Sequence, residues 1–305
     1  MPPSSPDLRT VSGTSADGAP LGWAHWAEDR ALAVLLALAL RLPLRRRVPF
    51  AGWVAQHLVA PLAGANRRVR ANLAHVCPDL PESEVRRLCG RVSNNIGRAM
   101  IELFSGAEFA RFAATQPLTG PGVAALEAAH AHKRPVVLVT GHLGNYDVAR
   151  AALLAHGYRV GGLYMPMSNP AANRRYIAAI ESIGKPLFPR GRGGMAGMVR
   201  FLRQGGMLGV VADQHMDHGE PLDFLGKPAL TALSAAELAL KYGALLVPVY
   251  GIRQADGLHF AIRIEAPVPP SDARTMTQAL NDSLAAQVRE HCDQWFWVHR
   301  RWGSV

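Results

Sequence analysis

A histidine and an aspartate five positions apart are the two side chains of this sequence best suited to acid–base chemistry. His142 and Asp147 stand in the run Thr-Gly-His-Leu-Gly-Asn-Tyr-Asp. A carboxylate that holds one histidine nitrogen fixes the tautomer and raises the basicity of the other nitrogen. Residues i and i+5 lie on different faces of a helix, so the chain must turn between them, and Gly144 allows that turn. The pair predicts a general base; the alternative is a histidine that ends a strand and an aspartate that caps the next helix.

A second run, Asp213-Gln-His-Met-Asp-His218, gathers two carboxylates and two imidazoles. These side chains are ligand types for a divalent metal ion. A metal-dependent hydrolase, in which this run holds the metal and His142 assists, is therefore an alternative function.

The run Pro189-Arg-Gly-Arg-Gly-Gly194 precedes a predicted helix. Glycines let the backbone approach an anion, and a helix N-terminus with arginines is suited to phosphate. Arg190 and Arg192 are thus candidate phosphate ligands; the alternative is a solvated basic loop.

Strand and helix patterns alternate from residue 135 onward. The β-branched run Pro135–Thr140 is typical of a buried strand, and His142 follows it directly, at the strand end where α/β sheets bind ligands. Asp256-Gly257 suits a hairpin turn. Alternation predicts an α/β fold: a mostly parallel mixed sheet flanked by helices, with an N-terminal helical layer that includes a helix from Pro81 to Phe104. Further expected strands are 158–163, 207–212, 245–252 and 258–264, and expected helices are 145–155, 170–182, 194–204, 231–242 and 274–292.

The N-terminal segment predicts contact with a membrane. Residues 1–20, rich in Pro, Ser, Gly and Asp, indicate a disordered tail. We expect residues 21–48 to form a membrane-associating helix, because tryptophans precede its apolar run and an arginine cluster follows it. The run is about half the roughly 20 residues that a spanning helix needs, and the alternative is a helix packed on the protein core. Residues 49–305 are expected to form a single domain.

Composition narrows the class of partner. The 305 residues are 49% hydrophobic and 18% charged, with a net charge of +10 carried mostly by arginine. Arginine suits bidentate phosphate contacts, so anionic lipid or a phosphorylated ligand is expected. Zinc-finger spacing and RNP-like aromatic patterns are absent, which argues against nucleic acid. The three scattered cysteines are expected to be free thiols.

The run His142-x4-Asp147 resembles the HX4D signature of the lysophospholipid acyltransferase superfamily. Its surroundings, Gly-His-Leu-Gly-Asn-Tyr-Asp, are similar to the lipid A branch of that superfamily, the Kdo-dependent lauroyl and myristoyl acyltransferases. The similarity continues in family order over residues ~65 to 302, and includes Asn72–Pro78, Asn169-Pro170, Asp213-Gln214, Phe224–Pro228 and Gln294–Trp302.

This resemblance implies a glycerolipid-acyltransferase-like fold and a reaction without metal or cofactor. Acyl carrier protein, or acyl-CoA, would present a thioester. His142 would take the proton of a hydroxyl on a lipid A precursor, and Asp147 would orient His142. Backbone N–H groups of Gly144 and Asn145 are candidates for the oxyanion site.

The resemblance also implies that Asp213 and Gln214 line the substrate site. The enzyme is expected at the cytoplasmic face of a bacterial inner membrane, with a glycolipid acceptor and no nucleic acid. Alternative acceptors are a lysophospholipid or a lyso-aminolipid, although the Phe-Pro-Glu-Gly-Thr-Arg motif of the glycerolipid branch is absent. A noncatalytic protein that binds anionic lipid is a third class.

Overall fold

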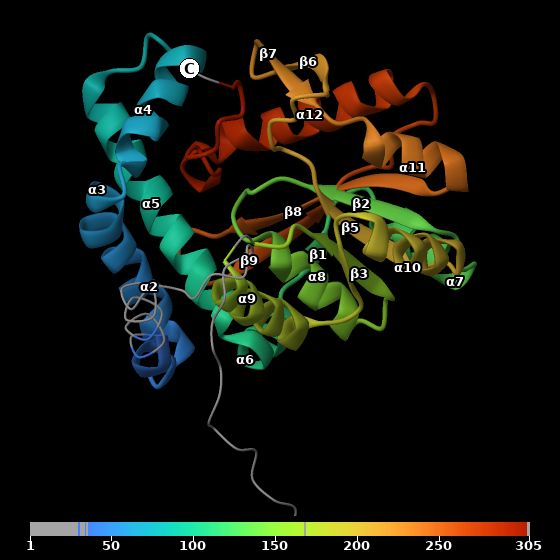
Figure 1. Cartoon of the computed structure of the whole chain (residues 1–305), viewed down its shortest axis with the longest axis horizontal. Coiled ribbons are helices and arrows are strands. Elements are labelled where there is room, and N and C mark those ends of the chain that lie inside the picture. The colour runs from blue at the N-terminus through green and yellow to red at the C-terminus, as the bar shows by residue number, and fades with distance from the viewer. Residues whose placement is uncertain (1–29, 31–33, 35, 168, 304–305) are drawn as a thin grey trace, which may run out of the picture.

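The computed structural model describes residues 30, 34, 36–167 and 169–303. Its centre is a seven-stranded sheet in the order β1-β9-β8-β2-β5-β3-β4 (Figure 1). Neighbouring strands run parallel except β8 and β9, which form an antiparallel hairpin. The predicted α/β fold with a mostly parallel mixed sheet is therefore confirmed. The strands are β1 Leu118–Thr119, β2 Val136–Thr140, β3 Val160–Tyr164, β4 Leu187–Pro189, β5 Met207–Val211, β8 Leu245–Arg253 and β9 Phe260–Ile264.

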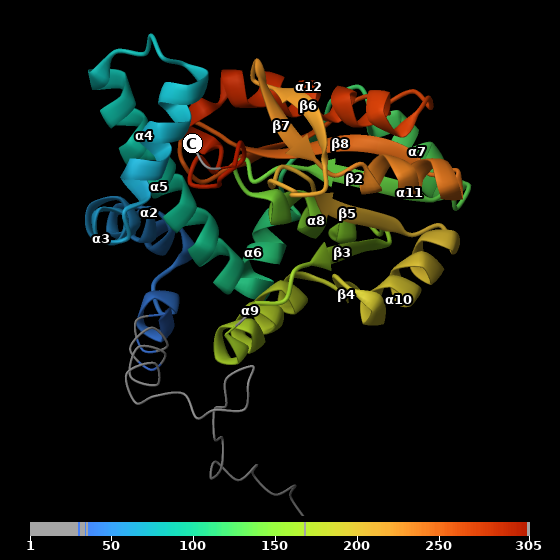
Figure 2. The ribbon, with the colours of Figure 1, turned by 45° about the horizontal axis from the view of Figure 1, so that its top comes forward.

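Helices cover both faces of the sheet (Figures 1 and 2). Alternate residues of β2 point to opposite faces: Leu138 packs in one apolar cluster, and Val137 and Val139 pack in another. The first face is covered by α6 Gly106–Ala113, α7 Val123–Ala131, α8 Tyr146–Ala155 and α9 Pro170–Ile183. The second is covered by α10 Arg192–Arg203, α11 Ser234–Tyr242 and α12 Ala273–Glu290.

An N-terminal helical layer packs beside one end of the sheet, as predicted (Figure 1). Its longest helix begins after Pro81 with two glutamates in the first turn, which interact favourably with the helix dipole. This layer buries apolar side chains against Trp295 and Trp297, so it shares one core cluster with the C-terminal segment. The layer comprises α2 Leu44–Val54, the π-helical turn η1 Ala55–Val59, α3 Ala60–Leu62, α4 Ala65–Val76 and α5 Glu82–Phe104.

The expected tail, residues 1–20, lies outside the described residues, as does much of the expected 21–48 helix. Residues 36–40 are helical, but the helix is interrupted at 41–43 before α2 begins. Pro43 accounts for the interruption, because proline disfavours the helical conformation of the residue before it. None of the described helices is both long and apolar enough to span a bilayer.

A small hairpin was not predicted. Strands β6 Glu220–Phe224 and β7 Lys227–Thr231 form a separate two-stranded sheet. The expected helix from residue 231 therefore begins later, at Ser234. Thr231 ends β7 instead, where its hydroxyl accepts a hydrogen bond from Arg301 at 2.6 Å.

A buried ion pair connects α5 to the carboxyl end of β8. Both guanidinium Nη atoms of Arg253 donate to Glu102, at 2.6 and 2.7 Å. Glu102 also accepts a hydrogen bond from the side chain of Asn145 at 2.8 Å. Glu102 and Arg253 are 2% and 5% exposed, so each charge depends on its partner for stabilisation.

We predict that Arg253→Met lowers the free energy of unfolding by about 3–5 kcal/mol, because it leaves the Glu102 carboxylate buried and unpaired. The double variant Glu102→Leu/Arg253→Met should lose less, since neither charge remains. Denaturant unfolding followed by circular dichroism measures both. Arg274→Met, which breaks an exposed pair with Glu220, is the control and should change stability by less than about 1 kcal/mol. Equal losses in the single and double variants would contradict the prediction.

Candidate active site

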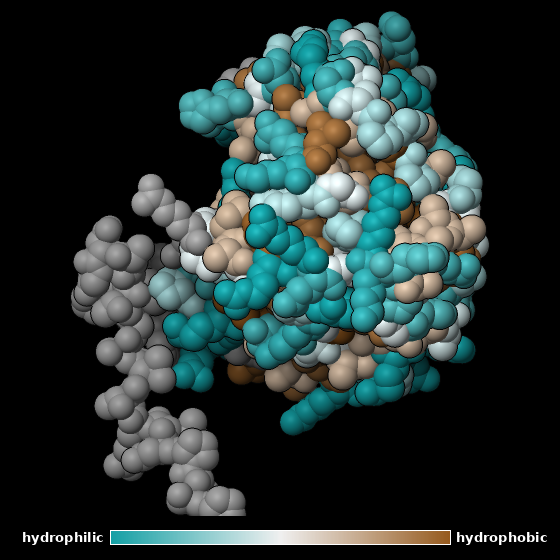
Figure 3. All heavy atoms as spheres, turned by 90° about the vertical axis from the view of Figure 1, so that its right-hand side faces the viewer, coloured by the Kyte–Doolittle hydropathy of each residue, from teal (hydrophilic) through white to brown (hydrophobic). Residues whose placement is uncertain are grey.

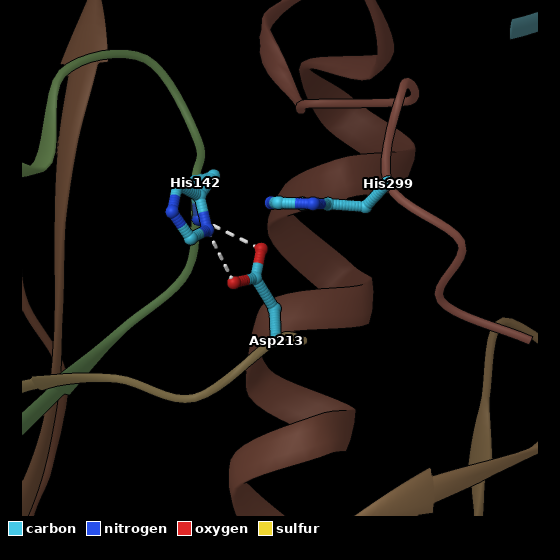
Figure 4. A group of neighbouring side chains, drawn as sticks. All are labelled: His142, Asp213 and His299. Carbon is cyan, nitrogen blue, oxygen red and sulfur yellow. Dashed lines mark hydrogen bonds and ion pairs between the residues drawn. The ribbon is translucent and has the colours of Figure 1, made fainter. Parts of the chain in front are cut away.

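His142 and Asp213 meet at the carboxyl edge of the sheet (Figure 4). The His142 Nδ1 atom lies 2.7 Å from one Asp213 oxygen, and the His142 backbone N–H donates to the other at 2.7 Å. The sheet register produces this contact. Thr140 of β2 pairs with Val211 of β5, and each site residue lies two positions beyond that pair.

Asp213 is a fully buried carboxylate with three N–H donors. The third donor is the indole Nε1 of Trp295, at 2.8 Å. Burial alone would raise the pKa of Asp213, but the charge of His142 and its hydrogen bonds outweigh burial and hold that pKa well below its usual range. Asp213 is therefore ionised. It fixes the hydrogen of His142 on Nδ1 and leaves Nε2 for a substrate.

Asp147 does not hydrogen-bond to His142, contrary to our expectation. The chain turns at Gly144, whose φ is 58°, but Asp147 then enters the first turn of α8 and its Oδ1 accepts from Arg150 at 2.8 and 3.0 Å. Its side chain is held by that buried pair, so Asp213 has the orienting position that we had assigned to Asp147. A catalytic role for Asp147 stays a prediction.

The expected oxyanion donors are engaged elsewhere. The backbone N–H of Gly144 donates to Gln294 at 3.0 Å, and that of Asn145 donates to Gly251 at 3.0 Å. The Asn145 side chain caps α8 by accepting from the N–H of Asp147. Gly144 is required for packing, because a Cβ atom there would lie 2.0 Å from the Gly251 oxygen. Both residues thus hold the loop in place, and their N–H groups are not free for an oxyanion.

Sequence reasoning missed His299, which lies beside the pair (Figure 4). Its ring centroid is 4.6 Å from that of His142, in an edge-to-face arrangement. Burial, aided by the nearby charge of His142, lowers the pKa of His299 to about 4. His299 is therefore neutral at physiological pH. The aromatic run Gln294–Trp302 was noted in the sequence, but it did not indicate which of its residues reaches the site.

The remaining predicted site residues follow the carboxyl ends of β4 and β5. Arg190 is exposed just after β4, at the same edge of the sheet, and Arg192 begins α10. Gln214 is exposed in the loop after β5. Contacts of these residues with a substrate stay predictions.

The run 213–218 is not the metal cluster that its sequence suggests. Within the described chain, the group with suitably close ligand atoms is His142, Asp213 and His299, whose atoms lie within 4.8 Å of one another. Asp213 already accepts hydrogen bonds from the His142 backbone N–H and from the Trp295 indole N–H. Neither N–H group loses its proton, so both hydrogen bonds compete with a metal ion for the carboxylate. The donor set therefore suits hydrogen bonding better than metal binding.

An apolar cavity adjoins the site between the sheet and helices α8 and α9. Tyr146 lines it, and the ring of Tyr146 stands edge-to-face with His142 at 5.4 Å. Its other walls include Leu138, Leu153 and Ile180, and the buried Asp147–Arg150 pair also lines it. A base beside an apolar cavity suits reactions of an apolar chain.

The site and fold define an acyltransferase. The chain belongs to the bacterial lipid A biosynthesis acyltransferase family, whose profile matches residues 19–304. It is similar to a phosphatidylinositol mannoside acyltransferase of Mycobacterium tuberculosis, strain CDC 1551 / Oshkosh, with 24% identity over 245 residues and 78% of each chain covered. It is also similar to a protein of the same name from Mycolicibacterium smegmatis, with 25% identity over 173 residues, 55% of this chain and 57% of the relative.

We predict that His299 makes the fold less stable in mild acid. An unfolded histidine has a pKa near 6.5, so the unfolded chain binds more protons than the folded chain between that pH and about 4. The contribution of His299 to the free energy of unfolding is therefore fully present above about pH 6.5 and is lost as the pH falls toward about 4. Between pH 7.5 and pH 5 the free energy of unfolding should fall by about 2 kcal/mol. Denaturant unfolding at the two pH values measures the loss. His299→Gln should show a smaller loss than the native chain, and an equal loss would show that other groups cause it.

Proposed function

We propose that this enzyme transfers a fatty acyl group from a thioester donor, acyl carrier protein or acyl-CoA, to a hydroxyl group of a glycolipid such as a lipid A precursor. The observation that carries the proposal is the His142–Asp213 hydrogen bond at the carboxyl edge of the sheet. It gives the imidazole a fixed tautomer and a partner for the positive charge that proton abstraction creates.

The transfer needs one base and no covalent enzyme intermediate. His142 Nε2 takes the proton of the acceptor hydroxyl as its oxygen attacks the thioester carbonyl. The new C–O bond forms, the C–S bond breaks, and the proton passes from His142 to the leaving sulfur. Asp213 stabilises the imidazolium throughout. His299, neutral and adjacent, adds no second positive charge to compete for Asp213.

The cavity beneath Tyr146 is suited to the acyl chain of the donor. Its wall is mainly aliphatic, and burial of each methylene is worth about 0.8 kcal/mol. A chain seated there would place its thioester near His142, since Thr140 and Tyr146 line the cavity on the side of the catalytic loop.

Two considerations support a glycolipid acceptor. The description of the family names lipid A biosynthesis, and the names of the relatives contain phosphatidylinositol mannoside. Both lipids carry sugar and phosphate. In addition, Arg190 is exposed at the same edge of the sheet as His142, where a headgroup phosphate could meet it.

We predict that His142→Ala lowers turnover by about 10²–10⁴-fold without unfolding the protein, because the general base is lost. The assay follows transfer from lauroyl- or myristoyl-carrier protein and from the CoA thioesters to lipid A precursors, phosphatidylinositol mannosides and lysolipids by mass spectrometry. Transfer that persists in His142→Ala, or no transfer by the native chain to any acceptor, would overturn the proposal.

The same assay distinguishes the role of Asp213 from that of Asp147. Asp213→Asn should lower kcat strongly, whereas Asp147→Asn should act through the packing of Arg150 and therefore on stability. Activity lost in a well-folded Asp147→Asn but kept in Asp213→Asn would instead make Asp147 the partner of His142.

We further propose that the N-terminal helical layer docks on an anionic bilayer, at the cytoplasmic face of the inner membrane. Nine of the thirteen large apolar side chains exposed by the described chain lie between Val34 and Met100. Phe50, Trp53 and Leu62 are 51%, 51% and 89% exposed. The face seen in Figure 3, away from this layer, is mostly hydrophilic with scattered apolar residues.

Basic residues flank the segment Phe50–Leu62 in the sequence. Arg45, Arg46, Arg67 and Arg68 are exposed near its ends, as suits an anionic leaflet. Arg47 does not contribute, contrary to our reading of the arginine cluster, because it is buried and pairs with Glu108 and Ser105.

We predict that the triple variant Phe50→Ser/Trp53→Ser/Leu62→Ser binds anionic vesicles at least about tenfold more weakly than the native chain, because each substitution removes apolar contact area. Vesicle co-sedimentation at low and high salt measures this. Leu240→Ser, at an exposed position of α11, is the matched control and should leave binding unchanged. Equal binding by the triple variant would refute this docking surface.

A further inference from the structure

Two glycines stand side by side in the middle of the sheet. Gly209 of β5 pairs with Gly162 of β3, and on its other side with Leu138 of β2. Both glycines line the apolar cavity. Glycine in a strand interior weakens the strand, and it often marks a place where a ligand approaches the backbone.

Packing explains the neighbouring glycine but not Gly209. A Cβ atom on Gly161 would lie 2.9 Å from Phe188 and 3.0 Å from Phe201, so Gly161 is needed for close packing on the opposite face. A Cβ atom on Gly209 would meet only the Gly161 oxygen, at 3.5 Å, an ordinary contact. The backbone at Gly209 also lies outside the left-handed region, so any residue could adopt it. The fold therefore tolerates a side chain at Gly209, and the empty volume there requires another explanation.

The rows of side chains on this face show where the space begins and ends. Toward His142, the next paired row is Thr140 and Val211. Away from His142, the next row is Val136, Met207 and Val160, and of these Val160 lines the cavity. Gly209 thus leaves a low trough between two rows of larger side chains, and the side chains of Leu187 and Arg150 lie over the neighbouring Gly162. A chain that enters from the catalytic loop meets this trough before the bulky third row.

We propose that Gly209, with Gly162 beside it, determines the longest acyl chain that the enzyme accepts. The trough admits the distal methylenes of a long chain, and the row of Val160 and Met207 stops it. This inference rests on the proposed function, since it names the chain-length determinant of the same site. Gly209 is the better position to test, because an added side chain at Gly162 would press on Leu187 at 3.1 Å.

The experiment compares the native chain with Gly209→Ala and Gly209→Val. Ala128→Val, which adds bulk at an exposed position of α7, is the control for added volume. Rates of transfer are measured with octanoyl, lauroyl and palmitoyl donors, and binding of the same CoA thioesters is measured by calorimetry. Thermal unfolding checks each fold, and valine, which favours strands, should not lower the melting temperature.

Gly209→Val should raise the ratio of kcat/KM for octanoyl over palmitoyl donors at least about tenfold, with Gly209→Ala intermediate and Ala128→Val unchanged. Calorimetry should show the same order of affinities. A folded Gly209→Val that keeps the native chain-length profile in transfer and in binding overturns this inference and leaves the proposed function intact. A third outcome combines two results: the native chain transfers to no acceptor, and Gly209→Val binds long-chain CoA thioesters more weakly than the native chain but binds short-chain ones equally well. That outcome overturns the proposed function and supports the trough.

Discussion

The buried charge of Asp213 is the constraint on which the site depends. A carboxylate removed from water is tolerated only when hydrogen-bond donors replace the water. Its donors come from two segments that are distant in sequence, the loop after β2 and Trp295 near the C-terminus. Both segments must dock before the charge can be buried, and Trp295 docks within the cluster that α4 and α5 also join. The stability of the helical layer and the orientation of the base are therefore parts of one arrangement.

A second buried carboxylate fixes the far end of the same loop. Glu102 holds Asn145, which caps α8, while Arg253 neutralises Glu102. The loop from His142 to Asn145 is thus fixed at both ends, as a preorganised site requires. This rigidity has a chemical consequence: the backbone N–H groups of His142, Leu143, Gly144 and Asn145 are all used internally. Negative charge that develops on a substrate must be stabilised by side chains or by groups beyond this loop.

Local patterns predicted the elements well, and long-range pairing decided the chemistry. The β-branched run of β2 and the acidic first turn of α5 are properties of contiguous residues, and both elements formed where expected. The partner of His142 depends on the register of β2 with β5, strands separated by more than sixty residues. The sequence spacing favoured Asp147 as the partner of His142, because Asp147 is close to His142 in the sequence and Gly144 permits a turn between them. The competing pair of Asp147 with Arg150 has the i,i+3 spacing of an ion pair on one helix, and this spacing is the signal that would have turned the prediction away from Asp147. His299 was hidden for the same reason, since docking of the C-terminal segment brings it to the site.

The same two strands carry the base and the proposed chain-length determinant. Gly209 lies in β5 and Asp213 lies two residues beyond its end; Leu138 lies in β2 and His142 lies two residues beyond its end. Strands rise about 3.3 Å per residue, so roughly 13 Å separates the trough level from the catalytic level. That separation is set by a paired, doubly covered sheet, which is among the least deformable parts of a domain. A loop-built pocket could adapt to a longer chain by moving, whereas a pocket floored by central strands changes length only when a side chain changes. Selectivity that depends on the presence or absence of one methyl group at Gly209 is what such a rigid floor would produce.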